Sequence, residues 1–171
     1  KHSVLQASSE ALVGKRFAIH EVCVRSLSPG ELLEIDAYIG EEYLTTYTSD
    51  GLIATTPTGS TAYSMSCGGP IISPNSKCLC ITPISPHNLT LRPLIIPDDS
   101  QIKFVINSSR KGISLHFDSQ IYPLETPISI EISKADMELR LIRMQNQTFF
   151  SAIRNKLMWG TNLRQRKSND E

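Results

Sequence analysis

One stretch of the chain, Ser49 to Pro70, concentrates residues that could bind a ligand. It reads SDGLIATTPTGSTAYSMSCGGP: Asp50 precedes a glycine, a short apolar run follows, and residues 57–61 form a turn dense in hydroxyl groups. Glycine lets a ligand approach the backbone closely, and serine and threonine hydroxyls both donate and accept hydrogen bonds. Such a loop suits a phosphate group or a sugar hydroxyl.

The elements around this loop would set its geometry. Residues 52–54 predict a strand, residues 62–67 a helix, and Gly68-Gly69-Pro70 stops that helix. The start of a helix leaves backbone N–H groups without partners and carries a partial positive charge, which favours an anion. The alternative is an ordinary capped helix with Ser60 or Thr61 as the N-cap residue. Spacing alone leaves both interpretations open.

The rest of the chain predicts a mainly β fold, an antiparallel β-sandwich. Many short segments of β-forming residues are separated by turn signals, and ten prolines and nine glycines fit that punctuation. Residues 32–39 and 43–48 form a predicted hairpin that delivers Asp50. The first fourteen residues predict a connector or the end of an earlier element. The predicted β-segments are 16–24, 32–39, 43–48, 79–84, 93–97, 101–107, 112–117, 128–132 and 139–142.

The domain prediction is one β domain over residues 1–150, followed by a C-terminal helix and a charged tail over 151–171. The helix is expected to begin near Ser151 and to end at Trp159-Gly160. A chain of 171 residues can bury about two thirds of its surface in one core. Because it begins with Lys1 rather than Met, we interpret it as a piece of a longer protein.

Composition excludes several classes of function. The formal net charge is +0, which gives no argument for nucleic acid or a membrane surface, and no apolar run approaches the ~20 residues of a membrane helix. Four sparse cysteines without a C-x-x-C pair indicate a reduced, cytoplasmic protein. No zinc spacing, Walker A loop or G-x-S-x-G elbow occurs, and Asp98-Asp99 is better explained as a turn than as a Mg²⁺ site, so we predict no metal site in this chain.

The string DGLIATTPTGSTAYSMSCGGPI resembles the signature of the NAD kinase family. Further similarities lie on either side of it in the expected order, and the resemblance runs from about Phe17 to Trp159. The flanking matches are Glu21, Pro86-His87 with Arg92-Pro93-Leu94, and Asp118-Ser119-Gln120.

This resemblance implies the C-terminal β domain of an enzyme that phosphorylates the adenosine 2′-hydroxyl of NAD with Mg²⁺-ATP (polyphosphate in some relatives), giving NADP. The family's catalytic aspartate belongs to a G-G-D-G segment in an N-terminal domain, which is absent from this chain. The resemblance therefore implies no catalytic residue here and an inactive chain when it is alone. It also implies a homodimer or homotetramer.

Residue by residue, the resemblance implies that Glu21 binds ribose hydroxyls and that Asp50 accepts hydrogen bonds from the dinucleotide. His20 stands where the family usually has Asn, and Thr48 stands where many bacterial relatives have a basic residue. The expected NAD-binding residues are His20, Glu21, Asp50, Thr58, Thr61, Ala62, Tyr63, Ser64, Ser66 and Gln120. Weaker contacts are expected from Glu31, Thr48 and His87.

Two alternatives remain. One is a lipid kinase of the diacylglycerol or sphingosine type, against which the T-P-T-G-S-T-A-Y string and Glu21 argue. The other is a non-catalytic dinucleotide-binding or regulatory module, for which the absent G-G-D-G segment leaves room. A G-G-D-G segment upstream in the intact protein would favour the kinase.

Overall fold

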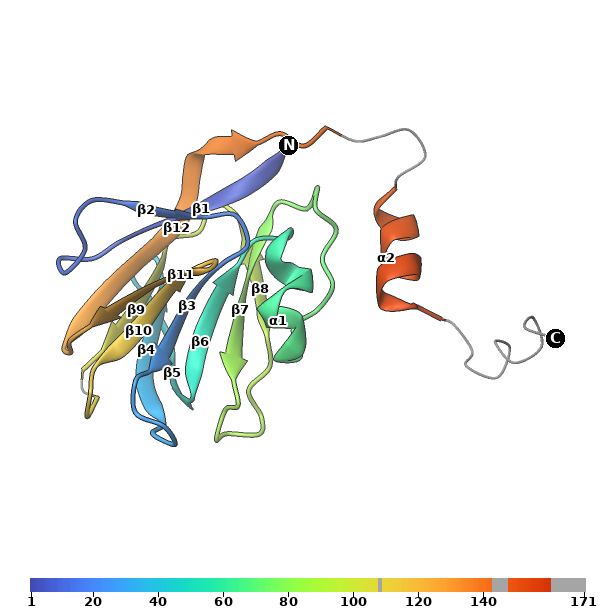
Figure 1. Cartoon of the computed structure of the whole chain (residues 1–171). Coiled ribbons are helices and arrows are strands. Elements are labelled where there is room, and N and C mark those ends of the chain that lie inside the picture. Colours follow the sequence, from blue (N-terminus) through green and yellow to red (C-terminus); the bar gives the residue numbers. More distant parts are fainter. Residues whose placement is uncertain (108, 143–147, 161–171) are drawn as a thin grey trace. The chain divides into compact units, whose positions relative to one another are not determined.

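The computed structural model describes residues 1–107, 109–142 and 148–160 (Figure 1). Two compact units can be distinguished, Lys1–Arg140 and Leu141–Glu171. The first unit contains the strands and helix α1, and the second contains helix α2. The predicted charged tail beyond residue 160 lies outside the described residues, and a domain boundary at residue 150 stays a prediction.

The first unit consists of two six-stranded antiparallel sheets, so the mainly β prediction is confirmed. Sheet A has the strand order β2-β1-β12-β9-β4-β5, with strands β1 His2–Ser8, β2 Arg16–Ala18, β4 Leu33–Ile39, β5 Glu42–Ser49, β9 Ile102–Ile106 and β12 Ile128–Leu139. Sheet B has the order β11-β10-β3-β6-β7-β8, with strands β3 Glu21–Ser26, β6 Gly51–Thr55, β7 Cys78–Ile84, β8 Leu94–Pro97, β10 Ile113–Phe117 and β11 Gln120–Leu124. The predicted hairpin is β4–β5, which leads directly to Asp50.

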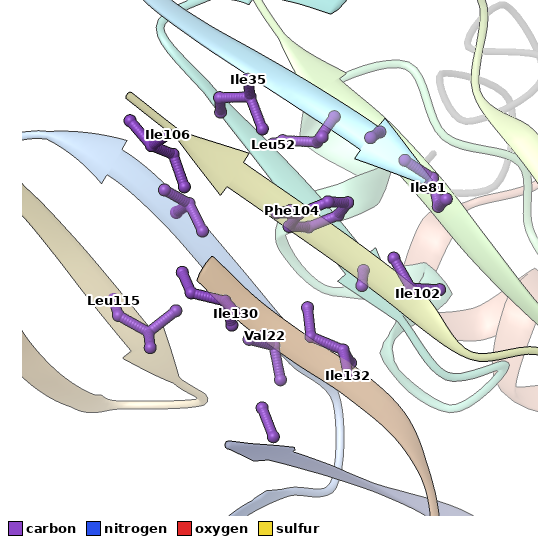
Figure 2. Close-up of a cluster of buried hydrophobic side chains, with 14 of the residues drawn as sticks. Val22, Ile35, Leu52, Ile81, Ile102, Phe104, Ile106, Leu115, Ile130 and Ile132 are labelled. Carbon is purple, nitrogen blue, oxygen red and sulfur yellow. The ribbon is translucent and has the colours of Figure 1, made fainter. Parts of the chain in front are cut away.

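The main core lies between the two sheets. Alternate residues of each strand point inward, as the period of two requires. Figure 2 shows this cluster, in which Phe104 and Ile130 of sheet A face Val22, Leu52 and Ile81 of sheet B. All five side chains are fully buried. The sandwich therefore gives sheet B a second, outward face that is free to carry a site.

Helix α1, Tyr63–Ser66, covers part of that outward face. A small second cluster of buried residues, Cys23, Ile53 and Ile84, lies there, and Tyr63 and Cys67 pack against it. A short 3₁₀ turn, η1 Gly59–Thr61, leads into the helix. The loop that the sequence singled out is thus held on the outside of sheet B.

The expectation of a connector at the N-terminus is wrong. Strand β1 pairs with both β2 and β12, and Leu5 and Ala7 are buried in the core. A register irregularity between Ser3 and Leu5 breaks the alternation of apolar residues, which is the signal that would have indicated a strand.

The prediction for the second half of β12 is also wrong. The strand runs without interruption to Leu139, whereas the predicted separate strand 139–142 does not form and Ile142 is 95% exposed. The residues after Ile132 are mostly polar and show no strand pattern of their own. They continue the strand because they pair with β1. Strand β11 went unpredicted, and the predicted strand 16–24 is two strands, β2 and β3.

Helix α2, Phe149–Leu157, begins two residues before the predicted Ser151. The side chain of Thr148 accepts the N–H of Ser151 at 3.1 Å, and the Ser151 hydroxyl accepts the N–H of Thr148 at 3.0 Å, so Ser151 belongs to the first turn. Met158, with φ at +50°, ends the helix just before Trp159. Among the described residues no helix has the length and apolar character needed to cross a membrane.

Candidate functional site

The loop after β6 is fastened to the residues that precede Glu21. The hydroxyl of Thr55 donates to the carbonyl of His20 at 2.8 Å, and that of Thr56 donates to the carbonyl of Ile19 at 2.8 Å. The N–H of Gly59 then donates to the Thr56 hydroxyl at 3.1 Å. These threonines therefore hold the P-T-G-S-T loop against the start of β3, and are not available for a ligand.

Gly59 is required by the closeness of this contact. A Cβ atom at this position would overlap the carbonyl oxygen of His20 and the hydroxyl of Thr55. The obstacle includes backbone, which cannot rotate away. The glycine thus permits the loop to lie directly on the segment that carries Glu21.

The interpretation of Ser60 or Thr61 as a helix cap is wrong. The N-cap residue of α1 is Ala62, which makes no side-chain cap. Ser60 is fully buried, and its hydroxyl donates to the carbonyl of Pro57 at 2.7 Å and accepts the N–H of Ile72 at 3.0 Å. Because Ser60 lies inside the 3₁₀ turn that precedes the helix, its side chain closes the loop and does not cap α1.

Glu21 lies beside the start of α1, where the sequence suited a phosphate group or a sugar hydroxyl of a ligand. The pKa of its carboxyl group is raised, first by burial and also by the nearby Asp118. The backbone N–H groups of Ser64 and Tyr63 and the side chain of His20 oppose this rise. The first N–H groups of α1 therefore face a protein carboxylate. Within the described residues its buried Oε2 atom has no hydrogen-bond partner. An unpaired buried acceptor is costly unless a donor from outside meets it.

Asp118 positions this carboxylate through the backbone. One of its oxygens accepts the N–H groups of His20 at 2.8 Å and Glu21 at 3.1 Å, and the other accepts the N–H of Ile19 at 2.8 Å. The imidazole of His20 also lies 3.5 Å from Asp118. Sequence reasoning singled out Gln120 of the same motif and missed Asp118, whose signal was the position of an acid directly after a buried strand.

Next to Glu21, the outward face carries Tyr63, Arg25 and His116. The guanidinium carbon of Arg25 lies 5.9 Å from the centre of the Tyr63 ring. His116, beside Cys23 in the sheet, accepts or donates a hydrogen bond with the Ser114 hydroxyl at 3.0 Å. Burial, and to a smaller extent Arg25, lowers the pKa of His116, which favours its neutral form.

Asp50 lies at the opposite end of the β3–β6 strand pair from Glu21. Its N–H donates to the carbonyl of Ile84 at 3.0 Å, and its carbonyl accepts the N–H of Ser26 at 3.4 Å. Glu21 is the first residue of β3 and Ser26 the last, so the two acids are separated by about 16 Å along the strand. Within one copy of the chain, Asp50 and Glu21 do not converge on one point.

Glu31 and Thr48 also lie away from Glu21. The carboxylate of Glu31 accepts hydrogen bonds from Ser26 at 2.9 Å, Ser109 at 3.0 Å and the N–H of Arg110 at 2.8 Å. The N–H of Arg110 is the main cause that lowers its pKa to about 2. Glu31 therefore fastens two loops at the Ser26 end of β3. Thr48 accepts the N–H of His87 through its carbonyl at 2.9 Å, which places these two residues side by side.

The other predicted residues surround α1 and the loop. The Thr58 hydroxyl shares a hydrogen bond with the His2 ring at 2.9 Å, and the buried Ser64 hydroxyl shares one with Thr82 at 2.9 Å. Gln120, at the start of β11, accepts the Tyr122 hydroxyl at 3.0 Å. Thr61 and Ser66 are exposed, and Ala62 is half-buried.

Comparison with known proteins identifies this arrangement. Residues 19–144 match the family model described as the ATP-NAD kinase C-terminal domain. The chain belongs to the NAD kinase family. The family match covers Glu21, the P-T-G-S-T loop and Asp118, which are the parts that the fold brings together.

Curated NAD kinases support the same assignment. The chain is 42% identical over 156 residues to the NAD kinase of Flavobacterium johnsoniae, covering 91% of this chain and 53% of that protein. It is 41% identical over 145 residues to the NAD kinase of Heliobacterium modesticaldum, covering 84% of this chain and 51% of that protein. The chain thus spans about half the length of the curated NAD kinases it matches.

A solved structure shares the fold. The crystal structure of yeast NADH kinase complexed with NADH superposes with a TM-score of 0.83 at 26% identity, covering 95% of this chain and 51% of that chain. An NAD kinase from Archaeoglobus fulgidus in complex with ATP superposes with a TM-score of 0.68 at 22% identity, which shows the fold alone. The two-sheet architecture is therefore that of NAD and NADH kinases.

Proposed function

We propose that this chain is the dinucleotide-binding domain of an NAD kinase, and that the intact enzyme transfers the γ-phosphoryl group of ATP to the adenosine 2′-hydroxyl of NAD. Family membership and the likeness to an NADH kinase complexed with NADH support this proposal. The observation that carries it is the unpaired Oε2 of Glu21, which lies beside Tyr63 on the outward face of sheet B.

A carboxylate with a free oxygen is well suited to a ribose. It accepts hydrogen bonds only, and a pair of sugar hydroxyls supplies two donors. Glu21 is held in place by Asp118 and by the loop that ends at Gly59. Tyr63, in the first turn of α1, brings an aromatic ring close to this carboxylate, where a base can contact it. We therefore assign ribose binding to Glu21 and base contact to Tyr63.

We assign the groups that carry out the phosphoryl transfer itself to the rest of the intact enzyme. Such chemistry depends on positioning and on neutralisation of charge, and bound Mg²⁺ would supply positive charge to the phosphates of ATP. In the parts of the chain that the structure describes, no three His, Cys, Asp or Glu side chains come together as a metal site. We therefore assign neither the metal nor the catalytic base to these described residues.

Asp50 supports a further part of the proposal, a homodimer or homotetramer. Its carboxylate is half-buried, and it lies at the end of the β3–β6 pair far from Glu21. We assign its side chain to the ligand held by a neighbouring copy.

Four free cysteines are consistent with a cytoplasmic enzyme.

The test is NADP formation from NAD and Mg²⁺-ATP by the intact protein, with the 171-residue chain alone as a paired sample. We expect NADP from the intact protein and none from the isolated chain. Glu21→Gln should raise the KM for NAD, whereas Glu34→Gln, at an exposed position of β4 in the other sheet, should not. NAD binding without any NADP would indicate a non-catalytic module, and absence of NAD binding would overturn the proposal altogether.

A further inference from the structure

Strand β3 presents a row of chemically active side chains on the outward face of sheet B. Val22 and Val24 point into the main core, so the alternate residues Glu21, Cys23 and Arg25 share the opposite face. Cys23 is buried beneath Tyr63 and Cys67, and Glu21 and Arg25 flank it along the strand. The proposed site thus continues beyond Glu21 in the direction of Arg25.

Arg25 is an exposed cation on this face of sheet B. Its guanidinium lies 5.9 Å from the centre of the Tyr63 ring, which is a cation–π contact. No salt bridge or side-chain hydrogen bond to this guanidinium occurs within residues 1–107, 109–142 and 148–160. Burial raises the pKa of Tyr63 and the nearby Arg25 opposes that rise, whereas burial and, to a smaller extent, Arg25 both lower the pKa of His116. The fold therefore places the positive charge of Arg25 over the ring of Tyr63.

Tyr63 connects this charge to Glu21. Its backbone N–H faces the Glu21 carboxylate, while its ring lies under the guanidinium. The Cα atoms of Glu21 and Arg25 are separated by about 13 Å along the strand, and the contact with Tyr63 brings the long Arg25 side chain over the helix. A ligand that meets both residues must carry sugar hydroxyls at one point and an anion nearby.

We propose that Arg25 binds a phosphate group of the dinucleotide whose ribose is held by Glu21, and that it thereby favours ligands with a diphosphate. The inference rests on the proposed function and adds a residue that the sequence did not indicate as part of the site. The planar guanidinium can donate two parallel hydrogen bonds to phosphate oxygens, which an ammonium group cannot reproduce. The ring of Tyr63 keeps the guanidinium in place before the ligand arrives.

A purely structural role for Arg25, as a lid on Tyr63, makes a different prediction. It would weaken binding of every ligand that uses Tyr63, charged or not. A phosphate contact weakens only ligands that carry phosphate, and its contribution falls as salt is added. Lys103, whose ammonium lies 4.8 Å from the centre of the Tyr38 ring on sheet A, provides a matched cation–π control away from the site.

The experiment measures equilibrium binding of NAD, ADP-ribose, ATP and adenosine to the intact protein, each ligand alone, for the wild type, Arg25→Gln, Arg25→Lys and Lys103→Gln. We expect Arg25→Gln to weaken NAD and ADP-ribose binding about tenfold or more, the range of a lost charged hydrogen bond, and to leave adenosine binding unchanged. Arg25→Lys should recover part of the loss, and NAD binding by the Gln variant should depend less on salt. Lys103→Gln should bind all four ligands as the wild type does.

Each other result overturns a specific statement. An equal loss for adenosine and NAD would reduce Arg25 to a packing residue, and a loss confined to ATP would move its phosphate from the dinucleotide to the phosphoryl donor. Unchanged NAD binding by a folded Arg25→Gln variant would overturn the inference and leave the proposed function intact. A wild-type protein that binds no NAD would instead overturn the proposed function itself.

Discussion

Asp118 and Glu21 are joined by two hydrogen bonds, in each of which a different one of the two residues is the donor. The Asp118 carboxylate accepts the N–H of Glu21 at 3.1 Å, and the N–H of Asp118 donates to the carbonyl of Glu21 at 3.1 Å. Asp118 adopts φ at +53°, a conformation that Asp and Asn tolerate better than most residues. The turn after β10 therefore sets the place where β3 begins, and with it the place of the Glu21 carboxylate.

Asp118→Asn should weaken both folding and NAD binding. The amide keeps the conformation but replaces one accepting oxygen by an NH₂ group, so one of the N–H groups of residues 19–21 loses its acceptor. We expect the free energy of unfolding of the intact protein to fall by about 1–3 kcal/mol, measured by urea denaturation. Asp118→Ala should cost more, because it removes every acceptor and fits the positive φ less well. Equal stability of the wild type and both variants would contradict this role.

Glu21→Gln should separate stability from binding, and pH reveals the separation. Burial raises the pKa of Glu21, so the folded protein disfavours the ionised carboxylate. The stability that the protonated carboxyl group contributes is therefore present below its ordinary pKa and is lost as pH rises through the raised pKa. Glutamine does not ionise. The stability of Glu21→Gln relative to the wild type should therefore increase from pH values below the ordinary 4.5 up to neutral pH.

The same substitution should weaken NAD binding at neutral pH by about tenfold or more, since hydrogen bonds to a charged acceptor contribute roughly 1.5–3 kcal/mol. Thermal unfolding across pH and NAD titration of the two proteins check the two halves. A stability difference that shrinks with rising pH would show that the carboxylate is stabilised, not strained, in the fold.

Gly59→Ala should disturb the loop and Glu21 together. The added methyl group overlaps the His20 carbonyl, directly before Glu21, so β3 or the loop must move. We expect a loss of about 1–3 kcal/mol in unfolding free energy, the range for overpacking, together with weaker NAD binding. Gly40→Ala is the control: its Cβ meets open space in the β4–β5 hairpin, and only the positive φ of 59° carries a cost. NAD affinity should be normal in that variant.

Ser64 and Thr82 should show coupled effects on stability. Their buried hydroxyls share a hydrogen bond at 2.9 Å between α1 and β7. Ser64→Ala or Thr82→Val alone leaves one polar group without this partner, at a cost of about 1–3 kcal/mol, whereas the double variant removes both. The double variant should therefore lose less than the sum of the two single losses in urea denaturation. Strict additivity would mean that the hydrogen bond contributes nothing.

The sequence determined the fold class, the family and the position of the loop. Period-two alternation in segments such as 102–106 and 113–117 is a local property, and each segment buries the face that its own pattern specifies. The long string from Asp50 to Pro70 is equally local, which is why it identified the family before any tertiary contact was known. The sequence favoured a ligand as the close neighbour of the loop glycine, whereas in the structure the neighbour of Gly59 is the carbonyl group of His20.

Only the tertiary structure decided how these residues are used. Asp118 holds Glu21 across a sequence separation of 97, and β1 is a strand because β12 and β2 pair with it. Ser60 turns inward toward Ile72, although one interpretation of the sequence made it a helix cap. The opposite placement of Asp50 and Glu21 and the position of Arg25 over Tyr63 likewise follow from the register of β3 against β6 and from the packing of α1. These features depend on hydrogen bonds and packing between segments that are distant in the chain, and local pattern carries no information about such pairs.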